Sequence, residues 1–310
     1  MDNLPSVGST VDKIIGAVER AFGAVYRPYG MKREADAEAY RLTTIESAKT
    51  QAEAHRNLER VRAKVEADLI REEGKFNLES RLQARLQHEA LMQQQNIERI
   101  VVGALDGPEE NVGDEEIDPD WLGEFFERSK TVSRPEMQAL WSKVLALEAG
   151  APGRFSRRSL DILRGMSHRE AMQFRFVCRL AVGYGDNGVR RSIIDGARYD
   201  HWIWESSAPE IDLARFGLPF LAIKSMMRIG LVHDEHVSSQ ESARGEELLV
   251  RFSTTSLRLR AKRRGVCIRS YALTDVGREL SLLVTPEEDS DYIAALSASL
   301  SKFFFVLEEQ

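Results

Sequence analysis

Two short runs contain residue types that could do ligand chemistry. The first, residues 183–188, reads Gly-Tyr-Gly-Asp-Asn-Gly and matches the G-x-G-x-x-G spacing of a dinucleotide fingerprint. That fingerprint needs a strand before it and a helix after it, so that the pyrophosphate meets a helix N-terminus. Here a helical pattern comes before the run and a β-type pattern follows it. We therefore interpret the run as a helix end with a loop, and no cofactor is predicted.

The second run, His233-Asp234-Glu235-His236, offers two imidazoles and two carboxylates within four residues. A zinc site needs three or four convergent ligands, and the usual helical pair has the spacing H-E-x-x-H. This run lacks that spacing, so it is predicted to be a solvent-facing loop and no metal ligand is assigned. The sequence also contains no P-loop and no nucleophile elbow. No catalytic residue is predicted, and the protein is expected not to be an enzyme.

The strongest local charge signal lies in residues 251–269, which hold seven cations and no acid. A basic hairpin tip can contact the phosphates of a nucleic acid, and such contacts give affinity without selecting a base sequence. It can equally dock on acids of the protein itself, such as those in 106–120 or 287–291. Both interpretations stay open, with DNA and a protein as the candidate partners. The candidate binding residues are Arg258, Arg260, Lys262, Arg263, Arg264 and Arg269.

The largest element expected to position these groups is a long charged helix over residues 31–101. It has no proline and one glycine, Gly74, and strong helix formers dominate its composition. Its apolar positions form a narrow seam with spacings of three and four, which predicts a coiled-coil-like region with phase breaks near His55 and Gly74. A lone solvated helix held by i,i+4 charge pairs is the alternative. The residues predicted for homo-oligomerisation are Leu42, Ile45, Leu58, Val61, Val65, Leu69, Leu82 and Leu86.

An amphipathic helix is predicted before the long one, over residues 8–29, with a hinge at Pro28 and Gly30. Its apolar face could lie on a membrane, which would make the protein a membrane-acting effector. The polar face is poor in basic residues, however, so packing into a core or an oligomer is favoured.

Four short helices are predicted to follow an acidic linker. The linker, residues 106–120, holds eight acids and no base. The helices lie between Asp118 and Val182 and form a compact bundle. Their starts are indicated by a proline in the first turn, by a lone serine cap and by two capping-box patterns. These starts are Asp118-Pro119, Ser133 with Glu136, Ser156, and Ser167 with Glu170.

From residue 188 onward the pattern changes to a mixture of strands and helices. We expect a helix at 218–229, a strand pair at 247–253 and 265–273, and a helix at 274–284. This order resembles a winged-helix module, and residues 268–280, IRSYALTDVGREL, are similar to the strand and "LT..G..L" close of such domains.

The expected fold class is therefore mainly α, with a long coiled-coil-like helical region, a small helical bundle and a C-terminal α+β winged-helix-like domain. The predicted domains are 1–30, the amphipathic helix; 31–105, the oligomerisation helix; 106–120, the linker; 121–185, the bundle; and 186–310, the winged-helix-like domain.

Composition excludes several classes of protein. A chain of 310 residues predicts about two domains. The net charge of −6 argues against a uniformly basic nucleic-acid binder. The two cysteines, Cys178 and Cys267, lie far apart, so no disulfide framework is expected. No signal-peptide pattern and no apolar stretch long enough to span a bilayer occurs, which predicts a cytoplasmic protein.

Residues 121–163 resemble an uncharacterised bacterial family, domain of unknown function 2806, with the pattern "W..RFF..…VS.E.MQ.LW..ILAGE...PG.FS.RTL..L". Residues YRPYGMKREADAEA, near the N-terminus, also resemble that family. Two positions differ from the pattern, Leu147 and Ser159. The matching residues are Trp121, Phe125, Phe126, Val132, Ser133, Met137, Gln138, Leu140, Trp141, Leu145, Ala146, Glu148, Pro152, Gly153, Phe155, Ser156, Arg158 and Leu160.

This resemblance implies an architecture more than an activity. Related long-helix proteins resemble abortive-infection factors of bacterial anti-phage defence. The leading hypothesis is a non-enzymatic homo-oligomeric scaffold or sensor, with a place in phage defence. The alternatives are a winged-helix DNA-binding regulator and the membrane-acting effector.

Overall fold

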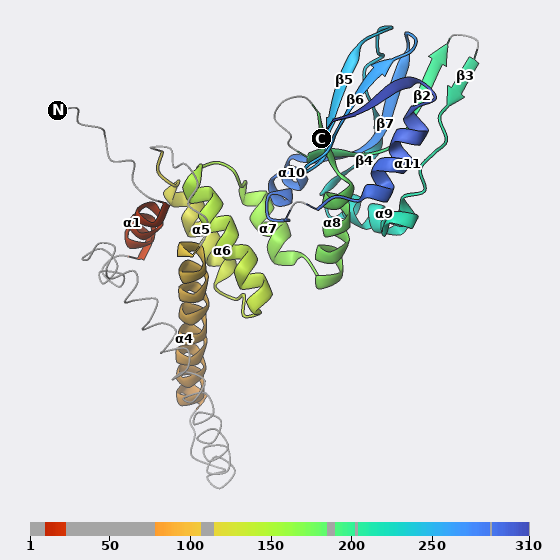
Figure 1. Ribbon diagram of the computed structural model, residues 1–310. Coiled ribbons are helices and arrows are strands. Elements are labelled where there is room, and N and C mark those ends of the chain that lie inside the picture. The colour runs from red at the N-terminus through yellow and green to blue at the C-terminus, as the bar shows by residue number, and fades with distance from the viewer. Residues whose placement is uncertain are drawn as a thin grey trace, which may run out of the picture. The chain divides into compact units, whose positions relative to one another are not determined.

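The computed structural model describes residues 10–22, 78–106, 115–184, 190–201, 204–285 and 287–309 (Figure 1). Contacts along the chain divide it into two compact units, Met1–Gly153 and Arg154–Gln310. Each unit has its own buried apolar core, so each is described by itself. Within the described ranges, no helix is long and apolar enough to cross a membrane.

Helices build the described part of the first unit. They are α1 (Thr10–Phe22), α4 (Leu78–Leu105), α5 (Pro119–Ser129) and α6 (Pro135–Gly150). The aromatic centre of the core is Phe125, whose ring centroid lies 5.3 Å from those of both Trp121 and Trp141. Helix α1 packs on α4, α5 and α6 and buries Ile14 and Val18. Ile14 and Val18 of the predicted apolar face are therefore covered by the unit's own helices.

The two halves of α4 have different surroundings. Its C-terminal half buries four apolar side chains, mainly against α6, whereas residues 80–91 are all exposed. Asn96 lies where the exposed half meets the buried half. Its amide nitrogen donates to the Lys130 carbonyl at 2.9 Å, and its oxygen accepts from Gln138 at 3.1 Å. The C-terminal apolar residues of α4 therefore pack into a bundle within one chain, and the predicted coiled coil is wrong. The four buried residues are Ile97, Ile100, Val101 and Ala104.

The second unit combines helices with a large antiparallel sheet. Its helices are α7 (Arg157–Gly165), α8 (His168–Leu180), the 3-10 turn η2 (Leu213–Phe216), α9 (Phe220–Arg228), α10 (Asp275–Ser281) and α11 (Ser290–Leu300). Its strands are β1 (Val182–Tyr184), β2 (Arg190–His201), β3 (Trp204–Ser207), β4 (Val232–Ser238), β5 (Glu247–Arg251), β6 (Ser256–Ala261), β7 (Val266–Leu273) and β8 (Phe304–Glu309).

The strand order is β4-β7-β2-β1-β5-β6-β8, with β3 paired to β2, and every pairing is antiparallel. The sheet curls into a half-barrel. Helix α9 packs on β4, α10 on β7 and β2, and α11 on β2 and β8. The Tyr292 hydroxyl, on α11, donates to the Ile194 carbonyl of β2 at 2.6 Å and fixes that helix on the sheet.

This sheet shows that the expected mainly-α fold class is wrong, as is its winged-helix-like domain. A helix, β5, β7 and a further helix do occur close to the predicted positions. However, β5 and β7 do not pair with each other, because β2 and β1 lie between them. Strands β6 and β8 were not predicted at all.

At three of the four predicted helix starts, a side chain caps the helix by accepting a hydrogen bond from the backbone of its first turn. Asp118 and Ser156 accept hydrogen bonds from the backbone of the first turns of α5 and α7, and Ser167 forms a complete capping box with Glu170. The bonds from Ser167 lower the pKa of the Glu170 carboxyl, because they favour its charged form. The capping box predicted at Ser133 is wrong: α6 has Arg134 at its N-cap and no side-chain cap.

The "LT..G..L" pattern has a physical explanation at the start of α10. Thr274 caps the helix by accepting from the Gly277 amide at 3.0 Å, and its hydroxyl donates to the Gly230 carbonyl at 2.6 Å. Gly277 lies so close to the preceding chain that an added Cβ would be 2.1 Å from the Leu231 carbonyl oxygen. Leu280 is buried one turn later. The motif therefore docks α10 on the residues that lead into β4.

Candidate functional site

Two irregularities in the sheet flank strand β7 and define the candidate site. On one side, Ile194 of β2 pairs with Ser270 and Gly196 with Arg269, so Asp195 is an extra residue in a β-bulge. On the other side, the register of β4 also shifts before His236 reaches its partner on β7. Bulges re-aim side chains and are common beside functional sites. Here they bring Asp195 and His236 together from two strands.

The Asp195 carboxylate is the centre of the site. Its side chain is only 2% exposed, and its Oδ2 lies 3.0 Å from His236 Nε2 and 3.3 Å from Arg269 Nη2. The other oxygen, Oδ1, is buried and has no hydrogen-bond partner among the residues that the structure describes. A buried acceptor without a donor is costly. Asp195 therefore has capacity for one further donor.

Arg269 connects Asp195 to a second acid, Glu210. The same Nη2 atom that meets Asp195 lies 3.4 Å from Glu210 Oε1, so one guanidinium nitrogen serves two carboxylates. The backbone supports this arrangement, because the Ile211 amide donates to the Asp195 carbonyl at 2.8 Å. The segment that carries Glu210 is thus fixed directly on the bulge.

Tyr271 lies two residues beyond Arg269 on β7 and packs against His236, with ring centroids 4.0 Å apart. Burial raises the pKa of the Tyr271 hydroxyl, and the negative charges of Asp195 and Glu210 raise it further, against a smaller opposite effect of Arg269. The phenol therefore stays protonated at neutral pH and is available as a hydrogen-bond donor.

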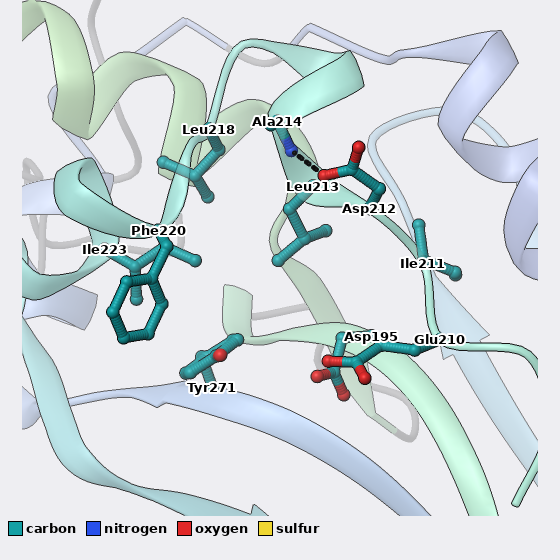
Figure 2. Close-up of a pocket in the computed structure, with 10 residues that line it drawn as sticks. All are labelled: Asp195, Glu210, Ile211, Asp212, Leu213, Ala214, Leu218, Phe220, Ile223 and Tyr271. Carbon is teal, nitrogen blue, oxygen red and sulfur yellow. Dashed lines mark hydrogen bonds between the residues drawn. The ribbon is translucent and has the colours of Figure 1, made fainter.

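A pocket of about 350 Å³ lies beside these groups (Figure 2). This volume is within the range usual for small-molecule sites, roughly 300–1,000 Å³. Figure 2 shows Asp195, Glu210 and Tyr271 at one side of the pocket and the apolar residues of η2 and α9 across from them. The lining residues are Asp195, Glu210, Ile211, Asp212, Leu213, Ala214, Leu218, Phe220, Ile223 and Tyr271.

The wall formed by η2 and α9 is set by local chemistry. Asp212 caps η2 by accepting from the Ala214 amide at 3.0 Å, and Gly217 ends the turn with a left-handed φ of 81°. The chain then enters α9, whose first residue, Phe220, lines the pocket and is 60% exposed. Lys224 places its ammonium 5.5 Å from the centre of that ring, so the ring already meets a cation.

All charged side chains in the lining are carboxylates, while apolar side chains make most of the remaining wall. Arg269 offsets part of this negative charge but also binds two of the acids. The site therefore suits a ligand with a positively charged N–H donor and an apolar body. His236 and Asp195 resemble an acid–base pair, and of the two only Asp195 lines the pocket.

The six candidate binding cations lie in different surroundings. Arg269 belongs to the site just described, and Arg258 lies 3.5 Å from Glu247 on β5. Lys262 donates to the Ser301 carbonyl and lies over Phe305. The other three are exposed: Arg260 on β6, and Arg263 and Arg264 in the turn that follows it. Arg263 stacks over the ring of Tyr199.

The other predicted sites can be placed only in part. The run His233-Asp234-Glu235-His236 is exposed but lies in strand β4, not in a loop. The described part of the chain contains no group of three residues suited to hold a metal ion. Leu82 and Leu86 are exposed on α4. Residues 185–188 of the glycine run and six predicted oligomerisation residues, Leu42, Ile45, Leu58, Val61, Val65 and Leu69, lie outside the described residues.

Sequence reasoning did not identify Asp195, Glu210 or Tyr271. A signal for Asp195 was present, because an acid followed by glycine interrupts a β-type run after Ile193 and Ile194. Glycine inside a strand pattern often marks a bulge. No local pattern marks Glu210 or Tyr271, since both reach the site only through the folded sheet.

Comparison with curated proteins and with solved structures finds no significant match. The resemblance to abortive-infection factors therefore stays a prediction. One family model does match, described as protein of unknown function (DUF2806), and it covers residues 80–297. This range includes all but the first two residues of α4, the first unit's α5 and α6, and the entire pocket. Since the match extends over more than half of the sequence, the chain belongs to the DUF2806 family.

Proposed function

We propose that the protein is a non-enzymatic sensor whose C-terminal unit binds a small organic cation in the Asp195 pocket. The observation that carries this proposal is the buried Asp195 carboxylate, which lines the pocket and has an oxygen without a hydrogen-bond partner among the described residues. A primary amine or a guanidinium would supply the missing donor. Hydrogen bonds to charged groups contribute more than neutral ones, because both charge and geometry favour them.

The rest of the pocket supports the same class of ligand. Glu210 and Asp212 add negative charge to the lining, which attracts cations and repels anions. Leu213, Leu218 and Ile223 offer a surface for an aliphatic or aromatic body. The ligand is therefore expected to be amphipathic, with one cationic end.

Isothermal titration calorimetry with three matched probes tests this proposal. 2-Phenylethylamine carries the cation, 2-phenylethanol is its neutral counterpart and phenylacetate carries the opposite charge. The amine is expected to bind about tenfold to a hundredfold more tightly than the alcohol, since a charge-assisted bond contributes roughly 1.5–3 kcal/mol. Phenylacetate is expected not to bind.

Variants locate the binding in the pocket. Glu210→Gln removes a lining charge from a side chain that is 67% exposed, so it should weaken amine binding without unfolding the unit. Glu241→Gln is the matched control, because Glu241 is exposed and does not line the pocket. Equal affinity for the amine and the alcohol, or no binding of either, would contradict the proposal.

We also propose that the protein is a homo-oligomer in which the exposed half of α4 meets a second copy. Leu82 and Leu86 lie one turn apart on this half and are 45% and 51% exposed. Charges of both signs surround them, including the Arg85 and Glu89 pair at 3.6 Å. A second copy that packed against this half of α4 would cover the two leucines.

Sedimentation equilibrium tests the oligomer. The intact chain should have at least twice the monomer mass, and replacing both Leu82 and Leu86 with lysine should shift it toward the monomer. Neither side chain is buried, so the double variant is expected to stay folded. Leu282→Lys, at a leucine that is 42% exposed in the other unit, is the control. A monomeric intact chain would be the contrary result.

A further inference from the structure

The outer face of strands β5, β6 and β8 combines cations with exposed apolar side chains. On β6 the buried residues Leu257 and Leu259 alternate with Arg258 and Arg260, so the two arginines share the opposite face. They lie across from β8, where Arg258 pairs in register with Leu307 and Arg260 with Phe305. Phe305 and Leu307 are 59% and 58% exposed.

This face has an excess of positive charge. Arg258 and Arg260 are two residues apart on β6, so they lie about 7 Å apart along the strand, and Lys262 follows directly after the strand ends. Glu247 is the acid of β5 on this face; it lies directly across from Arg260 in the sheet and its carboxylate pairs with Arg258. Arg260 is exposed, and two further exposed arginines, Arg263 and Arg264, follow in the next turn.

Phe305 gives the face a flat apolar surface among these charges. Strand β8 is at the end of the sheet, so the ring is not covered by a neighbouring strand on its far side. Lys262 Nζ lies over the ring, 5.0 Å from its centre, so the cation takes part of one ring face and the stacking surface is the remainder of this exposed side chain. Cationic tracks beside aromatic rings are the usual design of surfaces that bind single-stranded nucleic acid.

We infer that the outer face of β5, β6 and β8 binds single-stranded nucleic acid. The arginines contact successive phosphates, and an unstacked base lies on Phe305. An acidic polypeptide would satisfy the arginines but would leave the ring without a stacking partner. A duplex would also leave the Phe305 ring without a stacking partner, because the faces of its bases are already stacked on one another. This surface is distinct from the Asp195 pocket and does not rest on the proposed ligand.

Fluorescence anisotropy tests the inference. The full chain is titrated into a labelled oligodeoxythymidine of about 15 nucleotides, a length near the upper end of the site sizes known for single-strand-binding sheets. Affinity should fall with rising salt as counterions return to the phosphates. Arg260→Glu should weaken binding at least tenfold and lower the steepness of the salt dependence. Phe305→Ala should weaken binding about tenfold but leave the salt dependence unchanged. Both side chains are exposed, so folding should be preserved.

Matched controls and competitors decide between partners. Arg164→Glu and Leu282→Ala make comparable changes at exposed positions away from this face, and both should bind like the unchanged protein. A duplex of the same length and poly-glutamate of equal charge should compete at least tenfold less well. Equal competition by either of them, or full affinity in Phe305→Ala, would overturn the inference. So would the absence of binding at low salt.

Discussion

Replacing Gly277 with alanine is expected to lower the free energy of unfolding of the C-terminal unit by about 3 kcal/mol or more. The added Cβ would be 2.1 Å from the carbonyl oxygen of Leu231, and this oxygen also accepts a hydrogen bond from the Thr274 amide at 3.1 Å. The clash involves backbone, which cannot rotate away as a side chain could. Helix α10 would have to move away from the chain that leads into β4.

Urea unfolding followed by circular dichroism measures this effect. Gly165→Ala is the control in the same unit, because the structure places no atom within 4 Å of the Cβ it would add. The control should stay within about 0.5 kcal/mol of the unchanged protein. If the two variants had similar stability, the close approach of α10 to Leu231 would be wrong.

Replacing Asp195 with asparagine is expected to have the second large effect, a loss of about 3 kcal/mol of stability together with the loss of 2-phenylethylamine binding. The asparagine has the same shape but no charge, so among the residues that the structure describes it leaves Arg269 with the exposed Glu210 as its one ion-pair partner. His236 also loses the carboxylate that lies 3.0 Å from its Nε2. Breaking a buried pair by removing one member is costly because the other charge stays.

A paired substitution separates charge from packing. Replacing Asp195 with leucine and Arg269 with methionine removes both members, and this double variant should recover at least half of the lost stability. Asp234→Asn, at an exposed acid on β4, is the control and should change stability by less than about 0.5 kcal/mol. If Asp195→Asn were as stable as the unchanged protein, the assigned ion pair would be wrong.

The parts of the fold that the sequence predicted correctly are those that depend on neighbouring residues. The starts of α5, α7 and α8 follow from Asp118, Ser156 and Ser167, whose side chains bond to the backbone within one turn. Thr274 and Gly277 similarly mark α10. In each case the residue and its partner are at most three positions apart, so the sequence contains the complete interaction.

Strand β6 was not predicted, although its sequence contains the pattern of a strand. Leu257, Leu259 and Ala261 alternate with polar residues, which is the pattern of a half-buried strand. The arginines between them are also typical of a basic hairpin tip, which is the structure that the sequence predicts for this segment. Only the pairing of β6 with β5 on one side and β8 on the other shows that it lies inside a sheet.

The sequence by itself determined the family membership, the helix starts and the positions of several strands, because these depend on short patterns of side chains. Only the tertiary structure decided the strand order and the candidate site. Asp195 and Arg269 are 74 positions apart, and they meet because a bulge in β2 turns one side chain toward β7. A bulge is fixed by its neighbours across the sheet, so no run of adjacent residues specifies where its side chain will point.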